Sequence, residues 1–351
     1  MKLCLKTLLA LLCVVLAATT LLVSCAPSSV VEETTTASSE TNEETELETI
    51  TYDGETEIRV SVLNGTTGFG AAQMIHKATS GFSVLNYNFT VESDAANVTA
   101  GLINGSVDIA ALPTNAAATV YNKTGGKVQI AAINTLGVLY LLTNDKVEVN
   151  SFADLKGKTV YCPAQNPAFI FEAICRANNL EPGKDVTIDT AFAQPADLRT
   201  AVASGQVDIA VLPEPMVTIA KNANASLKTA LDLTAEWEKV YGEGSLAQGC
   251  IVVRTEWAEA HPIELALFLG EYKESIEFTN NYPAEASEMI VEAGIFAQAP
   301  IAQKAIPNCN IVYITGEEMA TALDVFFTKL HAVNPAAVGG AIPDSGIYYG
   351  K

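Results

Sequence analysis

Short apolar runs alternate with segments of helical periodicity over most of the chain, beginning at Glu57. Runs rich in β-branched residues, such as "EIRVSVLN", predict strands, and segments such as "AAQMIHKA" have helical composition. Strands that alternate with helices predict a mostly parallel sheet with helices on both faces. The elements predicted for the first part are strands at 57–64, 87–93 and 107–112, a glycine-rich turn at 65–70, and helices at 71–78 and 95–106.

The same order of elements returns in the second part of the chain. The predicted elements there are strands at 157–162, 185–192 and 207–212 and helices at 167–180 and 195–205. Both parts contain the phrase Gly-x-Val-Asp-Ile-Ala-x-Leu-Pro, which begins at Gly105 and again at Gly205. Each copy predicts a glycine that ends a helix, then a buried strand, then a proline that ends the strand. Since ligands of open α/β sheets bind beyond the carboxyl ends of the strands, the residues after each proline are expected at a ligand-binding edge.

Two α/β halves joined by extended segments predict two lobes with a cleft between them. The apolar run at 128–144 is interrupted at 134–137 and predicts the first crossing, and the return is predicted near Gln248 and Gly249. The helical segments that follow, at 261–281, 284–295, 301–306 and 316–334, are expected to pack back on the first lobe. The predicted division is 57–138 with 250–351 for lobe 1 and 139–249 for lobe 2.

The first 25 residues have the layout of a bacterial lipoprotein signal peptide. Lys2 and Lys6 precede an apolar run, which ends in "LVSC", a sequence that resembles a lipobox with Cys25 as the lipidated residue. An uncleaved transmembrane anchor is the alternative. The segment 26–56 is dense in Glu, Ser and Thr and contains no Lys or Arg, so we expect a disordered acidic spacer between membrane and folded part.

Charge and cysteine content narrow the function classes. Ten of the 40 acidic and two of the 20 basic side chains precede residue 58, which leaves 30 acidic and 18 basic and a net charge of −12. This balance disfavours nucleic-acid binding. The cysteines outside the leader, Cys162, Cys175, Cys250 and Cys309, have no zinc-binding spacing, so no metal site is expected. Export permits disulfides, and buried free thiols are the alternative.

The sequence offers little for catalysis. His76, His261 and His331 are scattered, and no G-x-S-x-G motif or carboxylate dyad is present. The turn at 65–70 lacks the Gly-Lys-Ser/Thr ending of a phosphate-binding loop, so nucleotide hydrolysis has no support. We therefore expect neither an enzyme nor a bound cofactor.

Polar residues follow the predicted strands at positions where a ligand would contact them. In the first turn, Asn64, Thr66 and Thr67 offer hydrogen-bonding groups and Phe69 offers a ring for stacking. An ordinary turn with a helix cap is the structural alternative. The candidates at the other strand ends are Thr114, Asn115, Gln165, Asn166 and Glu214, and those at the crossings are Asn134, Thr135 and Gln248, where hinge and ligand contact remain alternatives.

Several of these segments together resemble a known family. The segments on which the resemblance rests are the lipobox, "GLINGSVDIAALPTNAA", "SFADLKGKTV", "LEPGKDVTI" and "LRTAVASGQVDIAVLPEP". They are similar to type II periplasmic solute-binding lipoproteins of bacterial ABC importers, in the group for nitrate, sulfonates, taurine and the thiamine pyrimidine precursor. The ending "GGAIPDSGIYYG" indicates a branch of its own. The resemblance implies a two-lobed fold, a monomer that is lipid-anchored outside the cytoplasm, and an ABC permease and ATPase as partners.

One turn departs from the pattern of that family. Where members often carry a Gly-rich turn, this chain has "YCPAQNPAF", in which Pro163 and Pro167 each remove an amide donor. The change disfavours sulfonate or nitrate and favours a larger, more neutral or aromatic solute, such as a vitamin. The alternative functions are an enzyme on the same scaffold, similar to a menaquinone-pathway dehydratase or a thiamine-pyrimidine synthase, and a sensor domain.

Overall fold

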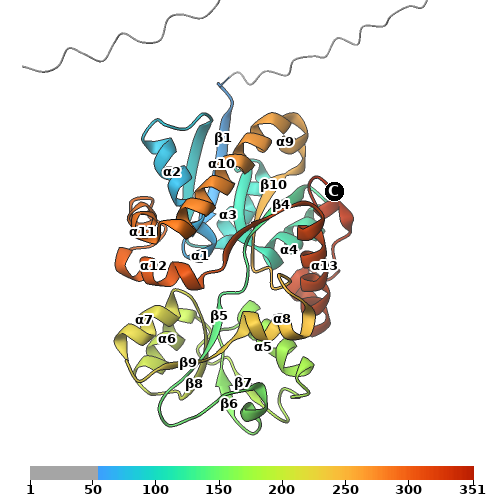
Figure 1. Ribbon diagram of the computed structural model, residues 1–351. Coiled ribbons are helices and arrows are strands. Elements are labelled where there is room, and N and C mark those ends of the chain that lie inside the picture. Colours follow the sequence, from blue (N-terminus) through green and yellow to red (C-terminus); the bar gives the residue numbers. More distant parts are fainter. Residues whose placement is uncertain (1–53) are drawn as a thin grey trace, which may run out of the picture. The chain divides into compact units, whose positions relative to one another are not determined.

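The computed structural model describes residues 54–351, which form two β-sheets flanked by helices (Figure 1). The predicted signal peptide, Cys25 and most of the predicted spacer lie outside these residues. Within the described part of the chain, no helix is both long enough and apolar enough to cross a membrane.

The first sheet lies in the upper part of Figure 1. Its strands are β1 (Glu57–Leu63), β2 (Asn86–Glu92), β3 (Ile109–Pro113), β4 (Val128–Thr135), β10 (Gly249–Arg254) and β11 (Ile311–Ile314). They are arranged in the order β11-β4-β10-β3-β1-β2. Strands β1 to β4 run in one direction, and β10 and β11 run antiparallel to them.

Helices cover both faces of this sheet. They are α1 (Thr66–Phe69), α2 (Ala72–Thr79), α3 (Ala95–Asn104), α4 (Thr114–Thr124), α9 (Thr255–Ala260), α10 (Pro262–Asn281), α11 (Pro283–Glu292), α12 (Ala299–Ala305) and α13 (Gly316–Val333). Side chains alternate along β3: Ile109 and Ala111 pack with α1, α2 and α9 to α12, whereas Ala110 and Leu112 pack with α3, α4 and α13. The strand is therefore buried on both faces, as the continuous apolar run predicts.

The second sheet lies in the lower part of Figure 1. Its strands are β5 (Leu139–Thr143), β6 (Thr159–Tyr161), β7 (Thr187–Asp189), β8 (Ile209–Pro213) and β9 (Lys228–Asp232), in the order β7-β6-β8-β5-β9. Strand β5 runs antiparallel to both of its neighbours, β8 and β9. Helices α5 (Asn166–Ala177) and α8 (Leu233–Tyr241) pack on one face, and α6 (Pro195–Ala203) and α7 (Met216–Ala223) pack on the other.

The predicted two-lobed α/β fold with helix-flanked sheets is confirmed, and both sheets contain parallel and antiparallel pairs. The elements differ from the prediction in a few places. Strands β9 and β11 were not predicted, and α1 begins within the stretch that the sequence indicates as a turn. The predicted helix 167–180 ends at Ala177. Gly105 adopts the left-handed conformation (φ 79°) and closes α3, as its position in the sequence indicates. The exact limits of the lobes stay a prediction.

Helix α13 packs on the first lobe, as expected of the last helices, and also on the second. It packs against β4 of the first sheet and against α5 of the second. The Phe326 ring lies 6.2 Å from that of Trp237 in α8, and Lys329 Nζ lies 4.7 Å from the ring centre of Tyr241. Because buried apolar residues such as Leu323, Phe326 and Phe327 occur at neighbouring positions of α13, the helix has apolar surface for both lobes. One core cluster thus continues from lobe to lobe.

Candidate functional site

The polar residues predicted at the first crossing bond to one another. Asn134 Nδ2 donates to the backbone oxygen of Thr67 (3.1 Å) and to Tyr272 Oη (2.9 Å). Asn134 Oδ1 accepts from Thr135 Oγ1 (3.1 Å). Both Asn134 and Thr135 are buried. The side chains of Asn134 and Thr135 thus bond within the protein, and hinge and ligand contact both stay predictions for them.

Gln248 joins the two crossings. Its backbone N–H donates to Thr135 O (3.0 Å), and its backbone oxygen accepts from Thr114 N (3.1 Å). Its side-chain Oε1 accepts from Val138 N (2.8 Å), and Val138 O in turn accepts from Glu214 N (2.9 Å). The residues that follow β3 and β8 are therefore both attached to the crossing segments. Gln248 also fits a hinge position.

Close packing fixes the crossings further. A Cβ atom added at Gly137 would lie 2.1 Å from Thr234 Oγ1, and one added at Gly249 would lie 2.6 Å from Asn134 Oδ1. Side chains at either position would force neighbouring atoms to move. Glycine is thus required for the close approach of the chain at both predicted crossings.

Three of the predicted strand-end residues carry buried oxygen atoms without a hydrogen-bond partner. Among the described residues these atoms are Thr114 Oγ1, Asn115 Oδ1 and Asn166 Oδ1, besides Thr234 Oγ1 and Arg254 Nε. An unsatisfied buried polar group costs about 1–3 kcal/mol. A bound molecule with N–H or O–H donors would supply the missing partners.

All three residues lie at the start of a helix that follows a strand, β3 in the first lobe and β6 in the second. Thr114 and Asn115 begin α4, and Asn166 begins α5. The Thr114 hydroxyl lies beside the thiol of Cys250, but this thiol donates to Leu112 O (3.6 Å) and leaves Thr114 Oγ1 unbonded. Burial raises the pKa of Cys250 to about 12. Gln165, just before α5, is exposed and has φ 65°, a strained conformation for a residue with a side chain.

The first turn lies differently from the prediction. Phe69 is fully buried and packs edge-on against Phe296 at 6.1 Å, so its ring offers no face to a ligand. This corrects the predicted stacking role, because α1 turns the ring into the core. Asn64 is exposed, and its backbone N–H bonds to Glu92 O (2.9 Å). Thr66 and Thr67 are half-buried at the start of α1.

Glu214 is almost fully buried, with 4% of its surface exposed. Its Oε2 accepts from Thr218 N (3.1 Å) and its Oε1 from Thr218 Oγ1 (3.0 Å). Burial raises the pKa of Glu214, and the bonds from Thr218 oppose this rise. The side chain therefore turns onto α7 and faces a cavity there.

This cavity, which we call the interlobe cavity, lies between α7 of the second lobe and α12 of the first and has a volume of about 370 Å³. Two hydrogen bonds cross it from lobe to lobe: Tyr140 Oη donates to Asn308 O (2.9 Å) and Lys304 Nζ donates to Asn222 Oδ1 (3.5 Å). The volume falls in the range of small-molecule sites, roughly 300–1,000 Å³. The lining residues are Tyr140, Glu214, Val217, Thr218, Lys221, Asn222, Thr229, Lys304 and Asn308.

Of these lining residues, the sequence indicated only Glu214. The others are spread over β5, α7, β9 and the region of α12, and no local motif unites them. The contacts above connect Thr67, Thr114, Asn134, Thr135, Gln248 and Glu214, and they do not connect Asn64, Thr66, Phe69, Asn115, Gln165 or Asn166 to that group.

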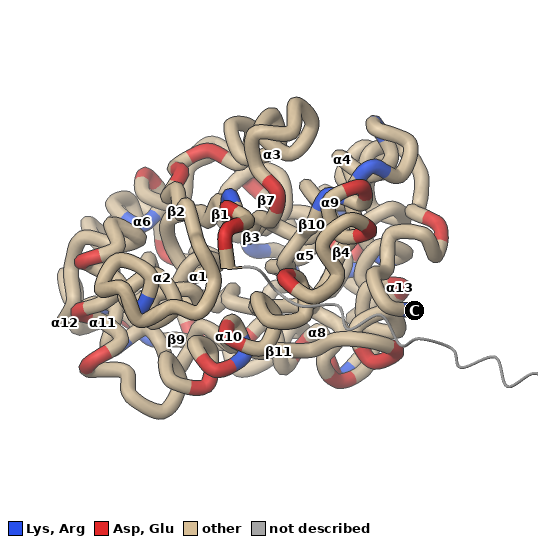
Figure 2. The backbone as a smooth tube through the Cα atoms, turned by 90° about the horizontal axis from the view of Figure 1, so that it is seen from above, with Lys and Arg blue, Asp and Glu red and all other residues tan. Residues whose placement is uncertain are grey.

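The cysteines Cys162, Cys175, Cys250 and Cys309 are all buried and free, which settles the disulfide alternative for the described residues. In the same part of the chain, no cluster of three or more His, Cys, Asp and Glu side chains is placed to hold a metal ion. Acidic residues outnumber basic ones and are spread over many elements (Figure 2).

Comparison with known protein families shows to which family this chain belongs. A family model described as NMT1/THI5-like matches residues 80–286, which is more than half of the chain. The chain belongs to this family. None of the functionally curated proteins matches this NMT1/THI5-like protein in sequence.

Solved structures similar to this NMT1/THI5-like protein share its two-lobed architecture. One is an ABC transporter protein from Parabacteroides distasonis, with 27% identity, a TM-score of 0.71, and 85% of this chain and 100% of that chain covered. Another is the periplasmic aliphatic sulphonate-binding protein of Escherichia coli (14%, 0.66, 83% and 95%). A third is the alkanesulfonate-binding protein of Xanthomonas axonopodis pv. citri bound to MOPS (16%, 0.57, 82% and 94%). The resemblance to type II solute-binding proteins of ABC importers is confirmed.

Proposed function

We propose that this protein is an extracytoplasmic solute-binding protein, which captures a small organic molecule between its two lobes and delivers it to an ABC permease. The family match and the similar structures, among them periplasmic binding proteins, support this class of function. The crossings joined through Gln248 support a hinge between the lobes.

The observation that carries the proposal is the set of unpartnered oxygens at the strand ends. Thr114, Asn115 and Asn166 each bury one such atom where open α/β sheets bind their ligands. Burying these oxygens without a hydrogen bond lowers the stability of the unliganded protein, and apolar residues at the same positions would avoid this loss. Donors on a captured solute would remove the cost, so binding and closure would stabilise each other.

Delivery requires that the solute favour one arrangement of the lobes. A ligand shifts a conformational equilibrium only by its differential affinity for the two states. Contacts from both lobes are made together only when the lobes are closed, so the solute would favour the closed form and the permease would recognise it. We further propose that lipid on Cys25 holds a monomer at the membrane beside the permease and its ATPase.

Thermal unfolding of the full chain with small molecules of yeast extract tests the capture. The extract is expected to raise the melting temperature by several degrees, because a ligand that binds only the folded state stabilises it. Asn115→Ala and Asn166→Ala should lose most of this rise. Asn97→Ala is the matched control, since Asn97 lies in the first turn of α3 but is exposed and bonded to Glu92 (3.1 Å).

Mass spectrometry of the protein-bound fraction then separates capture from catalysis. The bound molecule is expected to be recovered unchanged after long incubation, whereas an enzyme on the same scaffold would release a product. If the extract neither raises the melting temperature nor compacts the protein in solution scattering, the capture proposal is wrong.

A further inference from the structure

The loop between α2 and β2 presents apolar side chains to the solvent. Phe82 is 78% exposed and Val84 is 69% exposed, the highest values among the large apolar side chains of the described residues. Their neighbours turn inward, because Ser83 Oγ donates to Glu271 Oε2 (3.4 Å) and Leu85 is buried. A loop that meets only water has the opposite pattern, with its polar side chains outside. The pattern favours contact of this loop with an apolar surface.

The exposure of Phe82 does not come from a loose backbone. Gly81, with φ 73°, follows α2, and its N–H donates to Ala78 O (3.2 Å). The N–H of Phe82 donates to Lys77 O (2.8 Å). Together these two bonds form a Schellman motif, in which an apolar residue at the position of Phe82 frequently packs against the last turns of its own helix. Here the backbone bonds are made and the ring stays exposed.

Leu267 of α10 extends this apolar surface. It is 39% exposed and lies one helical turn before Glu271, on the same side of the helix. Because Glu271 accepts from Ser83, this turn of α10 lies close to the loop. We call Phe82, Val84 and Leu267 the apolar patch.

The apolar patch lies at the end of the first lobe where the chain enters the fold. Strand β1 begins at Glu57, which pairs with Asn86 at the start of β2. The side chain of Asn86 also donates to Glu55 O (3.4 Å). Figure 1 shows the loop after α2 at the upper end of this lobe, near the start of β1. The sequence that follows Cys25 therefore joins the described fold beside the patch.

We propose that the apolar patch rests on the outer surface of the lipid bilayer to which the chain is anchored. This inference rests on the lipid anchor at Cys25 in the proposed function. A disordered chain of the length predicted for the spacer at 26–56 spans roughly 30 Å, so the anchor keeps the bilayer within reach of the patch. Such a tether makes the contact intramolecular, with an effective concentration on the order of mM, and a weak contact is then sufficient.

The size of the patch favours a lipid surface over a protein partner. A stable protein interface buries about 800 Å² on each partner and needs a matching shape. The three side chains of the patch supply only a small part of that area. A bilayer needs no matching shape, and apolar side chains enter its interfacial region singly or in small groups.

Charge plays little part in the proposed contact. Near the patch, Lys77 pairs with Glu274 (3.4 Å), and Glu271 accepts from Ser83 and from Tyr87 Oη (2.9 Å). The charged groups are thus of both signs and already have partners. We therefore expect the patch to bind neutral phosphatidylcholine, with little dependence on salt.

The position of the patch determines which way the ligand edge would face. Strands β1, β2 and β3 are parallel, and Thr114 follows the carboxyl end of β3, whereas the patch lies at the amino ends of β1 and β2. A protein that rests on the patch directs its ligand edge away from the bilayer. It would capture solute in this orientation and leave the lipid surface to meet the permease, which a contact of only three side chains permits.

Site-specific quenching by lipids tests this contact. The full chain is produced in a bacterium that acylates lipoproteins and is incorporated into phosphatidylcholine vesicles. A polarity-sensitive nitrobenzoxadiazole label is attached through Val84→Cys in the patch or through Lys184→Cys, an exposed position of the second lobe. Lipids that carry a nitroxide should quench the label at position 84 and leave the label at position 184 bright.

The thiols of the described residues do not interfere with this labelling. Cys162, Cys175, Cys250 and Cys309 are buried, so the reagent reaches the introduced cysteine first. The unmodified chain, treated in the same way, gives the background.

A second pair of variants tests the role of the ring. Phe82→Ser, combined with the label at position 84, should lower the ratio of contacting to free protein about 10-fold, because one large apolar side chain is lost from the contact. Val240→Ser is the matched control, since it removes an exposed valine of α8 in the second lobe and should change nothing. Melting temperatures without vesicles verify that all variants fold.

The outcomes separate this inference from the proposals on which it rests. If the chain is attached to the vesicles and neither label is quenched, or both are quenched equally, the patch does not rest on the bilayer and the lipid anchor stands. Quenching that Phe82→Ser leaves unchanged would overturn the role of the patch. Shielding of position 84 without vesicles, growing with protein concentration, would assign the patch to a second copy. If the chain does not attach to vesicles, the lipid anchor fails and this inference with it, whereas solute capture is tested independently.

Discussion

The two copies of the repeated phrase, Gly105–Pro113 and Gly205–Pro213, form the same local structure in the two sheets. In each copy a glycine with positive φ (79° and 75°) follows a helix and precedes a buried strand. Strand β3 lies between β1 and β10, and β8 lies between β6 and β5. One neighbour of each is parallel, and the other is the strand that enters from the opposite lobe.

The residue after each phrase forms a backbone hydrogen bond to a crossing segment of the chain. Thr114 N donates to Gln248 O (3.1 Å), and Glu214 N donates to Val138 O (2.9 Å). The repeat thus does more than bring residues to a ligand edge. In each lobe, its backbone also forms the hydrogen bonds that pair it with the crossing strand.

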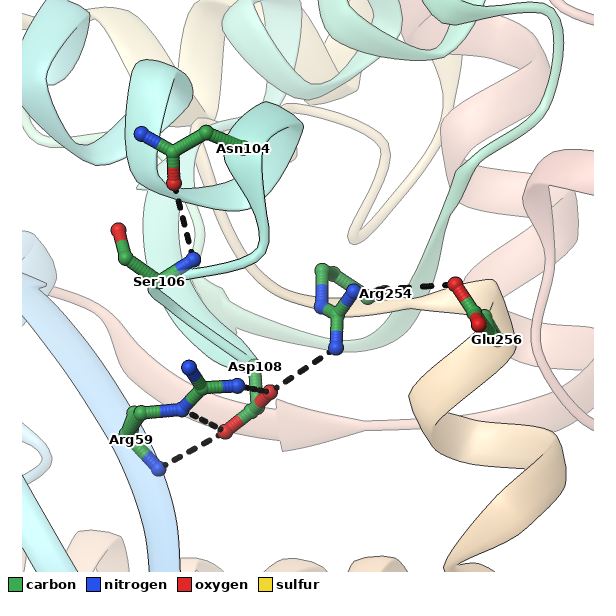
Figure 3. A network of polar contacts seen from close by, with 6 residues as sticks. All are labelled: Arg59, Asn104, Ser106, Asp108, Arg254 and Glu256. Atoms are coloured by element: carbon green, nitrogen blue, oxygen red, sulfur yellow. Dashed lines mark hydrogen bonds and ion pairs between the residues drawn. The ribbon is translucent and has the colours of Figure 1, made fainter.

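The copies differ at the other end of the strand, in the partners of their aspartates. Asp108 is buried and accepts from Arg59 Nε (2.8 Å) and Arg254 Nη2 (3.2 Å), as Figure 3 shows. Asp208 has 46% of its side chain exposed, accepts from Asn144 Nδ2 (2.5 Å) and forms an ion pair with the exposed Lys146 (3.5 Å). Arg254 and Asn144 each end or follow a crossing strand. The aspartate is therefore bonded to two arginines and buried in one lobe, and bonded to an amide and an exposed lysine in the other.

The aspartates give the largest expected difference between the copies. Asp108→Asn would leave two arginines without their buried carboxylate and should lower the free energy of unfolding by about 3–5 kcal/mol. Asp208→Asn removes an exposed group and should cost about 1 kcal/mol or less. Urea unfolding of both variants measures the contrast. Equal losses would show that the two copies are equivalent after all.

The glycines of the crossings give an intermediate effect. Gly137→Ala places a methyl group 2.1 Å from Thr234 Oγ1 and 2.5 Å from Leu246, and should destabilise the protein by about 1–3 kcal/mol or more. Gly249→Ala meets Asn134 Oδ1 at 2.6 Å and should cost less, because the added methyl group comes less close to its neighbours than at Gly137. Thermal unfolding compares the two. Adding Thr234→Ala to Gly137→Ala should restore part of the loss; no recovery would contradict the assigned clash.

The smallest effect concerns the residues after the prolines. Since the pKa of Glu214 is raised in the folded protein, the carboxyl group favours folding below about pH 4.5, and this contribution is lost as the pH rises through the raised pKa. Glu214→Gln should therefore gain stability relative to the unmodified chain as the pH rises above about 4.5, by about 1 kcal/mol or less.

Thr114→Val provides the comparison for this pH series. Thr114 has no charge that titrates in this range, so its stability difference from the unmodified chain should not change with pH. Melting temperatures of both variants across the series check the expectation. A pH-independent difference for Glu214→Gln would show that burial of Glu214 does not govern its ionisation.

Most of the fold could be predicted from the sequence because its strands are apolar runs with clear stops. β9 and β11 were not predicted because they are edge strands. β9 has little buried surface, and β11 is only four residues long. Their pairing with β5 and β4 depends on tertiary structure, which local periodicity does not contain.

The candidate site divides in the same way. Thr114, Asn115 and Asn166 could be selected because each follows a strand, and strand direction alone brings such residues to the carboxyl edge of their sheet. Lys221 and Lys304 could not, since each lies on an exposed helical position and they meet only where α7 faces α12. The burial of Phe69 likewise depends on Phe296, far away in sequence.

Helix α13 has a consequence for the cooperativity of folding. Because its apolar residues belong to one core that extends into both lobes, unfolding of either lobe would expose part of the core of the other. The free energies of the two lobes are then shared, and neither lobe is an independent folding unit. We therefore expect the two lobes to melt together, and any lobe movement in the proposed function would have to leave this shared core intact.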